Sequence, residues 1–216
     1  ELKEIASVLI KFPNVLILTD DIYEKIIYDN NKFNTLASVE PKLKSRILTL
    51  NGVSKAYCMT GWRLGYCGAN KDIISGMNKI QSQSNTSTSS ISMAAAVEAL
   101  SGNQEFIEKN NIQFKKRRDI IVEKLNKISG IFCKTPPGAF YVYPNCEGLL
   151  NKKTPQGNII KTDEDLMNFL LESEGIAGVH GEAFGLSPYF RLSYAASEKT
   201  IIEACERIKR GCELLK

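Results

Sequence analysis

Residues 47–69 read ILTLNGVSKAYCMTGWRLGYCGA and place two predicted strands on either side of a lysine. Ile47 to Leu50 is a short apolar run, typical of a strand buried in an α/β sheet. Leu64 to Ala69 is a second such run. Ser54-Lys55 comes shortly after the first run, and Arg63 directly precedes the second. The segment therefore predicts a sheet edge that carries cationic side chains.

A further apolar run upstream, Val15 to Leu18, predicts a buried strand that ends in acidic residues, among them Asp20. Before it, Glu1 to Phe12 has the apolar spacing of an amphipathic helix. Ligands of open α/β sheets gather at the carboxyl ends of the strands, so we expect Asp20 and Tyr23 to lie near Lys55. A carboxylate, a phenol, a lysine and an arginine at one edge suit an anionic ligand that also needs a covalent amine.

The rest of the chain predicts a change of fold class along the sequence. Helices are expected at 71–83, 90–100, 104–128 and 163–173 and through 201–215, with a Ser/Thr-rich loop and cap at 82–92. Thr162 with Asp165 has the pattern of a capping box for the helix at 163–173. Two helices carry apolar stripes, namely Ile73, Ile74, Met77 and Ile80 in the helix at 71–83 and Ile201, Cys205, Ile208, Cys212 and Leu215 in the last. Short strands are expected at 131–134, 139–143, 176–179 and 190–194. We therefore predict an α/β protein in which residues 1–106 form part of a mostly parallel sheet. Residues 107–216 are predicted to form a smaller α+β domain that is entered through the long helix.

The composition is that of a globular protein, with 216 residues, 43% hydrophobic and 24% charged residues, and a net charge of +4. No apolar run approaches the ~20 residues of a membrane span, so we expect no membrane partner. The basic run Lys115 to Arg118 has no interleaved aromatic residues, which favours a solvated helix face over a nucleic-acid site. The six cysteines form no C-x-x-C pair, which argues against a metal site. We expect reduced, buried thiols and a cytoplasmic protein.

The segment Ser54 to Gly65 resembles the pyridoxal-phosphate lysine signature of class I aminotransferases, S-K-x-x-x-M-T-G-W-R-x-G. Three more stretches support the resemblance in the same order along the chain: Asp20 to Tyr23, Gly138 to Tyr141 and Phe190 to Ser193. The likeness is closest to aspartate aminotransferases of the bacterial type, which have fold type I. It covers essentially all 216 residues but corresponds to only the later half or so of such an enzyme. Residues 1–106 would then be the C-terminal part of the large domain that binds pyridoxal 5'-phosphate.

The resemblance implies a role for each residue at the predicted sheet edge. Lys55 would form a Schiff base with pyridoxal 5'-phosphate and later carry the proton between the substrate Cα and the cofactor. Asp20 would keep the pyridine nitrogen protonated, and the pattern D-x-x-Y selects Asp20 over the adjacent Asp21. Tyr23 would donate a hydrogen bond to the phenolic oxygen of the ring.

The resemblance also implies which residues bind the anionic groups. Arg63 would bind the cofactor phosphate as a two-pronged donor, and Ser54 would add a hydroxyl to the same phosphate. Arg191 is the candidate that binds the α-carboxylate of the substrate.

The function that the resemblance implies is transfer of the amino group of aspartate to 2-oxoglutarate. An aromatic amino acid or prephenate aminotransferase of the same family stays open, because by the resemblance the residue that reads the substrate side chain lies before Glu1. We therefore expect residues 1–216 alone to be inactive or nearly so, and the full-length protein to be a homodimer in which residues 82–92 are a candidate for reaching across. The alternative of another class is a non-catalytic α/β module in which Lys55 and Arg63 are surface cations.

Overall fold

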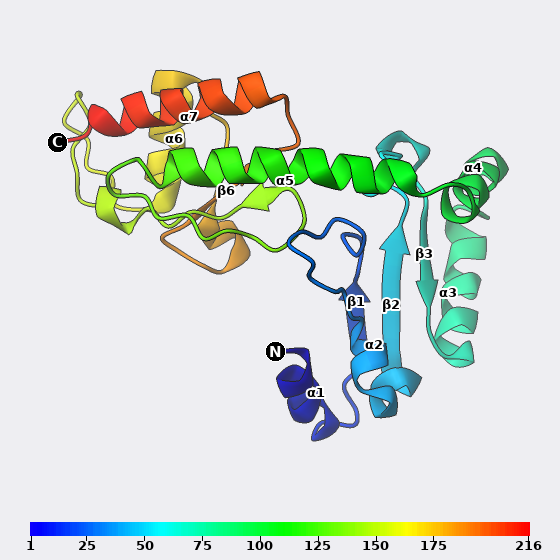
Figure 1. Cartoon of the computed structure of the whole chain (residues 1–216). Coiled ribbons are helices and arrows are strands. Elements are labelled where there is room, and N and C mark those ends of the chain that lie inside the picture. The colour runs from blue at the N-terminus through cyan, green and yellow to red at the C-terminus, as the bar shows by residue number, and fades with distance from the viewer. The chain divides into compact units, whose positions relative to one another are not determined.

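The computed structural model describes all 216 residues, which separate into two units, Glu1–Lys109 and Asn110–Lys216. Each unit has a three-stranded sheet of its own (Figure 1). The predicted α/β class is confirmed for the chain.

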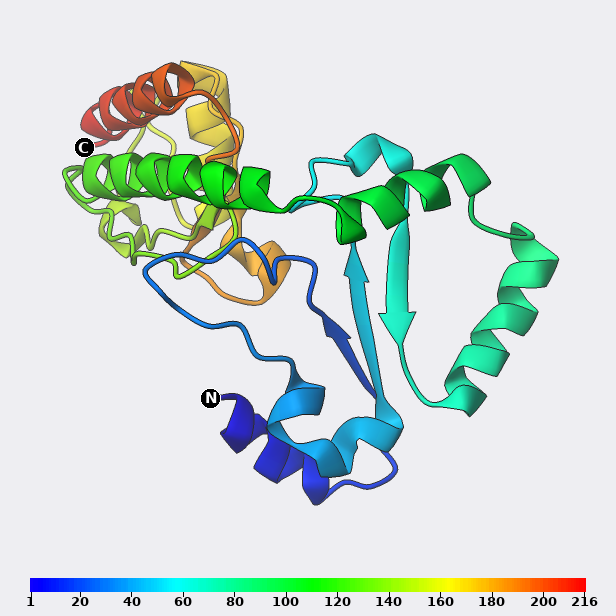
Figure 2. The ribbon, with the colours of Figure 1, turned by 45° about the vertical axis from the view of Figure 1, so that its right-hand side comes forward.

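The sheet of the first unit has the strand order β1-β2-β3. Strand β1 (Ile17–Asp20) is parallel to β2 (Ile47–Gly52), and β3 (Gly65–Gly68) is antiparallel to β2 on its other side (Figure 2). All three predicted strands are therefore present, but the first begins two residues later than the predicted Val15. The N–H of Val15 donates to the carbonyl of Phe12 in a turn, so Val15 is not part of the ladder.

Four helices accompany this sheet: α1 (Leu2–Ile10), α2 (Leu36–Val39), α3 (Lys71–Ser84) and α4 (Ser90–Ser101). Arg46 ties α1 to the sheet, since its guanidinium donates to the carbonyls of Leu9, Phe12 and Val15 at 2.5, 3.0 and 2.6 Å. A cation at the C-terminal end of a helix is favoured by the helix dipole. The predicted loop at 82–92 is shorter than expected, because α3 continues to Ser84 and the Ser89 side chain caps α4.

The apolar surface of the first unit is largely uncovered. The prediction that the first strand is buried is wrong, because Leu16 and Leu18 are 70% and 61% exposed. Helix α3 has no buried residue at all, and Ile80 on its predicted apolar stripe is 73% exposed. The physical reason is that the packing is one-sided. The face of the sheet that carries Ile17 and Ile47 packs on Ala6, Leu36 and Leu43. Leu18 points to the opposite face, and β1 has a neighbouring strand on one side only.

The second unit contains an antiparallel sheet with the order β4-β6-β5. Figure 1 labels its central strand β6 and the helices α5, α6 and α7 of this unit. The strands are short: β4 (Tyr141–Val142), β5 (Val179–His180) and β6 (Phe190–Ser193). The helices are α5 (Glu105–Leu125), which begins before the boundary of the units, α6 (Asp163–Glu174) and α7 (Glu198–Glu213). No helix of the chain combines the length and the apolar composition needed to cross a membrane.

The helix signals of the second unit are confirmed in detail. Thr162 and Asp165 form the predicted capping box at the start of α6, and Gly175 ends this helix in the left-handed conformation with φ 67°. Every residue of the predicted apolar stripe near the C-terminus is at most 5% exposed, namely Ile201, Cys205, Ile208, Cys212 and Leu215. These side chains belong to a closed core.

Three of the predicted strands of the second unit are much shorter than expected or absent, the first being 139–143, of which only β4 at Tyr141–Val142 forms. Residues 131–134 contribute only an isolated bridge between Phe132 and Asn145. The predicted strand at 176–179 is replaced by β5 at Val179–His180. The N–H of Ile176 donates to the Leu170 carbonyl at 3.1 Å as part of the end of α6, so this residue cannot also begin a ladder.

The expectation of buried thiols holds for only part of the set. Cys133, Cys146, Cys205 and Cys212 are buried, but Cys58 is exposed. Cys58 lies in a turn with a left-handed backbone, φ 55°, and that turn keeps its side chain out of the core.

Candidate active site

The register of the first sheet brings three predicted site segments to one edge. Asp20 is the last residue of β1 and lies opposite Leu50, and the N–H of Asp21 continues the ladder to the Leu50 carbonyl at 2.9 Å. Strand β2 ends at Gly52, two residues before Ser54. Strand β3 begins opposite Gly52 and runs away from this edge, so Arg63 just before it lies at the same edge.

Asp20 and Asp21 differ in their surroundings. Asp20 is exposed, and its Oδ1 accepts the N–H of Ile22 at 3.3 Å. Asp21 is half-buried; burial raises the pKa of its carboxyl, and the charges of Glu24 and Asp20 raise that pKa further. Burial and the neighbouring negative charges both disfavour the charged form of the Asp21 carboxyl, whereas a partner of a cationic ring must stay charged. Asp20, which is exposed at the sheet edge, thus stays the candidate for that role.

The loop that carries Lys55 is closed by its own backbone and anchored by an aromatic residue. The Lys55 carbonyl accepts the N–H of Cys58 at 3.2 Å, and the N–H of Met59 donates to the Val53 carbonyl at 3.3 Å. Tyr57, two residues after the lysine, is 7% exposed, and its hydroxyl donates to Gln104 Oε1 at 3.0 Å. Because Val53 and Tyr57 are both buried, the half-buried Lys55 is held at a defined position in the loop.

Arg63 sits in an unusual backbone conformation. It adopts φ 51° and ψ 49°, the left-handed region, which costs a non-glycine residue about 1–2 kcal/mol. The carbonyl of the preceding residue, Trp62, accepts a hydrogen bond from the Ser92 hydroxyl at 2.8 Å. One guanidinium nitrogen of Arg63 donates to the Thr60 carbonyl at 2.8 Å, while the exposed side chain has further N–H groups for an anion. Strain of this kind is typical of functional sites.

The donor set at this edge fits the chemistry of pyridoxal 5'-phosphate. The amine of Lys55 can bond an aldehyde, and the carboxylate of Asp20 can pair with a protonated ring nitrogen. The guanidinium of Arg63 and the hydroxyl of Ser54 suit a phosphate group. Tyr23, which is half-buried, follows Asp20 in a short turn, in which the N–H of Glu24 donates to the Asp21 carbonyl at 2.9 Å.

Arg191 lies in the second unit, on strand β6, and is flanked by two aromatic rings. Its guanidinium carbon is 4.7 Å from the ring centroid of Tyr141 on β4. It is 4.3 Å from the ring centroid of Phe184, which ends the 3-10 helix η4 (Gly181–Phe184). Rings on a guanidinium fix its plane and leave the N–H groups along its rim for a carboxylate. The geometry therefore suits recognition of a planar anion.

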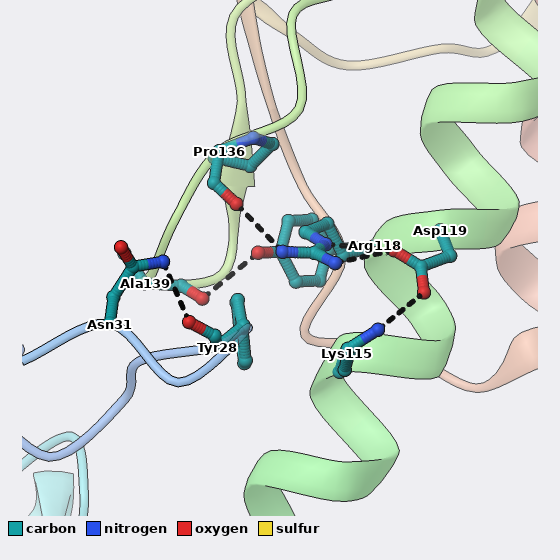
Figure 3. A network of polar contacts seen from close by, with 8 residues as sticks. Tyr28, Asn31, Lys115, Arg118, Asp119, Pro136 and Ala139 are labelled. Carbon is teal, nitrogen blue, oxygen red and sulfur yellow. Dashed lines mark hydrogen bonds and ion pairs between the residues drawn. The ribbon is translucent and has the colours of Figure 1, made fainter.

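Buried polar contacts fix the segment that leads to Tyr141. Arg118 on α5 is 2% exposed, and it donates to the Pro136 carbonyl at 3.0 Å and to Asp119 at 2.7 Å (Figure 3). The Tyr194 hydroxyl donates to the Ala139 carbonyl at 2.9 Å. The interpretation of the basic run as a solvated face is thus wrong for Arg118, because its guanidinium is needed to satisfy the loop carbonyl.

Two side chains of the second unit were not among the sequence candidates. Phe184 has only a weak signal, the following Gly185, whose φ of +74° allows the chain to turn there. Asp163 resembles an ordinary acidic residue of a first helical turn in the sequence, yet it is fully buried. Nothing in the sequence distinguishes it from its neighbour Glu164, which is exposed.

Comparison with known proteins gives consistent matches over the whole chain. A family model described as "Aminotransferase class I and II" matches residues 1–208. A probable aspartate/prephenate aminotransferase of Rhizobium leguminosarum bv. phaseoli is 54% identical over 212 residues, which are 98% of this chain and 53% of the relative. An aspartate aminotransferase of Rhizobium meliloti (strain 1021) is 50% identical over 99% of this chain and 52% of its own length.

Solved structures give the same result. The crystal structure of the aspartate aminotransferase from Rhizobium meliloti superposes with a TM-score of 0.96 at 50% identity, over 99% of this chain and 54% of that one. An aromatic aminotransferase from Pyrococcus horikoshii OT3 superposes with a TM-score of 0.84 at 31% identity, over 97% of this chain and 54% of that one. The chain thus spans about half the length of the relatives it matches.

Proposed function

The chain belongs to the family of class I and II aminotransferases, and we propose that the whole protein uses pyridoxal 5'-phosphate to move an amino group from aspartate to 2-oxoglutarate. The observation that carries the proposal is the single sheet edge in the first unit that joins Asp20, Lys55 and Arg63. In a non-catalytic module Lys55 and Arg63 would be ordinary surface cations, which need neither an anchored loop nor a left-handed backbone beside a carboxylate.

Lys55 performs two tasks in the proposed reaction. Its amine would hold the aldehyde carbon of the cofactor by a covalent bond, and the same amine, once released, would take the proton from the substrate Cα. When bound, pyridoxal 5'-phosphate supplies a cationic ring that accepts the electrons left at Cα. The anchoring of the loop through Tyr57 supports this role, because a base must keep its position while it moves a proton.

The other residues of the sheet edge bind and orient. Asp20 pairs with the ring nitrogen and keeps it protonated, and Tyr23 donates to the phenolic oxygen of the ring. Arg63 and Ser54 bind the phosphate. We expect Asp20→Asn to lower the turnover number at least tenfold, because a neutral amide does not hold the ring proton. Asp21→Asn, the matched control next to it, should leave turnover within about twofold.

Arg191 binds the α-carboxylate that every amino acid and 2-oxo acid substrate carries. The side chain of the substrate is a separate question. Two relatives carry aspartate in their names, and one of them carries prephenate as well, which supports aspartate first and prephenate as the second candidate. An aromatic amino acid is a further candidate, since an aromatic aminotransferase is among the structural neighbours.

The remaining expectations concern the protein as a whole. We propose a cytoplasmic homodimer, to which residues 82–92 contribute at the subunit contact. The large domain is proposed to end at residue 106 and the small domain to run from 107 to 216. Residues 1–216 alone are proposed to lack transaminase activity. Sedimentation of the whole protein and an assay of residues 1–216 test the first and last of these statements.

The test of the proposed function uses the purified whole protein. We expect a visible absorption band that Lys55→Ala removes and that Lys71→Ala leaves, because Lys71 is an exposed lysine on α3. To rank the substrates, we compare the transamination rates of aspartate and phenylalanine, each with an oxo acid as acceptor, and of prephenate with an amino acid as donor. A band that survives Lys55→Ala, or a colourless protein, would support the non-catalytic module instead.

A further inference from the structure

Asp163 is a buried carboxylate at the start of α6 that reaches a distant loop. It is 0% exposed. Its Oδ2 accepts the N–H groups of Gly181, Glu182 and Tyr189 at 2.9, 3.2 and 3.4 Å. Its Oδ1 has no hydrogen-bond partner in the protein. A buried charge is costly unless it is hydrogen-bonded, so these three amides are the groups that make the position tolerable.

The three amides belong to the two ends of one segment. Gly181 and Glu182 begin η4, which ends at Phe184. Tyr189 directly precedes β6, which carries Arg191. Phe184 therefore lies near the first end of the segment 181–189, and Arg191 lies just after its second end. The Arg191 guanidinium carbon is 4.3 Å from the centroid of the Phe184 ring, so Asp163 holds together the two parts of the chain that make this contact.

Close packing leaves this segment little freedom of its own. The N–H of Gly181 is shared between Asp163 and the Tyr189 carbonyl, which it meets at 2.7 Å. A Cβ at Gly181 would collide with the carbonyl oxygens of Leu186 and Tyr189. The Tyr143 hydroxyl lies 3.0 Å from the Gly181 carbonyl, and the Tyr143 ring stacks on Tyr189 with centroids 5.4 Å apart. The segment therefore closes around the carboxylate.

Asp163 is not needed to cap its own helix. Thr162 accepts the N–H of Asp165, and the Asp165 carboxylate accepts the N–H groups of Lys161 and Thr162 at 2.9 and 3.0 Å. These contacts complete the capping box without Asp163. The carboxylate of Asp163 is thus directed wholly to the segment 181–189.

We propose that Asp163 is a positioning residue for Arg191, which it holds in its binding orientation through Gly181, Glu182 and Tyr189. The proposal rests on the proposed function in one respect, namely that Arg191 binds the substrate carboxylate. Removing the Asp163 carboxylate frees both ends of the segment, so Phe184 and Arg191 lose their fixed contact. Binding of the carboxylate should then weaken, while the chemistry at Lys55 should not change.

The first experiment compares Asp163→Ala with Asp165→Ala in the whole protein. Both variants remove a first-turn carboxylate of α6 that accepts backbone N–H groups, but only the first one loses the contact with the Arg191 segment. We expect Asp163→Ala to raise KM for aspartate and 2-oxoglutarate about tenfold with kcat within about twofold, as for loss of ground-state binding. Asp165→Ala should lower stability but keep both constants within about twofold.

A double-mutant cycle tests whether Asp163 acts through Arg191. In an Arg191→Lys background, Asp163→Ala should raise KM by less than about twofold further, because the group that it positions is already gone. Asp163→Asn, which keeps one acceptor oxygen, should restore most of the affinity lost in the alanine variant. Full multiplication of the two single effects on KM would overturn the proposal. Where Asp163→Ala does not fold, the same cycle with Asp163→Ser, whose side chain is shorter and has no carboxylate, decides the question.

A measurement without activity separates this proposal from the proposed function. Amide hydrogen exchange in peptides that cover residues 179–190 should become faster in Asp163→Ala and stay unchanged in Asp165→Ala. An unchanged exchange rate in Asp163→Ala would contradict the proposal, whatever the enzyme does. A whole protein without transaminase activity but with this exchange pattern would contradict the proposed function and leave the structural role of Asp163 intact.

Discussion

Leu16, Leu18 and Ile80 of the first unit are 70%, 61% and 73% exposed, whereas Val142, Leu166 and Phe190 of the second unit are fully buried. The second unit thus has a closed core of its own. The first unit presents apolar surface of a kind that proteins cover with further structure. The candidate residues divide along the same line: the cofactor residues lie on the open unit, and Arg191 lies on the closed one. The proposed roles therefore assign reactive chemistry to one unit and substrate recognition to the other.

The largest expected effect is on the chemistry of the open unit. In the whole protein, Lys55→Ala should lower the turnover number by about 10⁴-fold or more, because both the covalent amine and the proton carrier are lost. The free energy of unfolding of the apoprotein should change little, since Lys55 is only half-buried. Lys71→Ala is the control, and steady-state kinetics with chemical denaturation are the measurements. An equal drop in the turnover number of both lysine variants would contradict the catalytic role proposed for Lys55.

The next effect tests the difference in packing directly. In the 216-residue chain, Leu166→Ala should cost about 2–5 kcal/mol of unfolding free energy, because it leaves a cavity in a closed core. Leu18→Ala should cost less than about 0.5 kcal/mol, because that side chain is already in water. Urea unfolding measures both values. Equal costs would show that the apolar face of β1 is covered and that the contrast between the units is wrong.

A smaller effect concerns recognition by the closed unit. Arg191→Lys in the whole protein should raise KM for both carboxylate substrates about tenfold to 100-fold, because lysine offers neither the planar fork nor the fit between Tyr141 and Phe184. The visible absorption of the cofactor should not change. A loss of that absorption would show that Arg191 belongs with the cofactor residues and not with substrate recognition.

The smallest effect is a difference in thiol reactivity. Burial raises the pKa of Cys133, Cys146 and Cys212 to about 12, so at pH 8 only ~10⁻⁴ of each is the reactive thiolate. Iodoacetamide at pH 8 should therefore modify the exposed Cys58 first and spare these cysteines. At pH 9 the thiolate fraction of each buried cysteine is still only ~10⁻³. Peptide mass spectrometry reads the result, and modification of Cys133 as fast as Cys58 would contradict it.

Most helices and the three strands of the first sheet could be predicted from the sequence. The reason is that the periodic spacing of apolar residues and the capping residues are contained in short stretches of chain. Thr162 with Asp165 and the stripe from Ile201 to Leu215 are examples of such signals. Burial was predicted less well, since Leu18 is part of an apolar run whether or not another layer covers it. Whether a strand is covered depends on segments remote in the chain, which a local pattern cannot report.

The candidate site shows the same limit. Lys55 and Arg63 were found because they stand in one continuous motif. Phe184 and Asp163 were not found, because their roles depend on a turn that returns the chain to Arg191 and on a carboxylate that reaches across 18 residues. Arg118 was misread because its run of basic neighbours hides the one side chain that is buried.

The most direct test of the account is to identify the lysine that holds the cofactor. The whole protein is reduced with borohydride in the presence of pyridoxal 5'-phosphate, digested, and examined by peptide mass spectrometry. We expect a pyridoxyl group on Lys55, in the peptide between the second and third strands of the first sheet. A pyridoxyl group on another lysine, or on none, would contradict it.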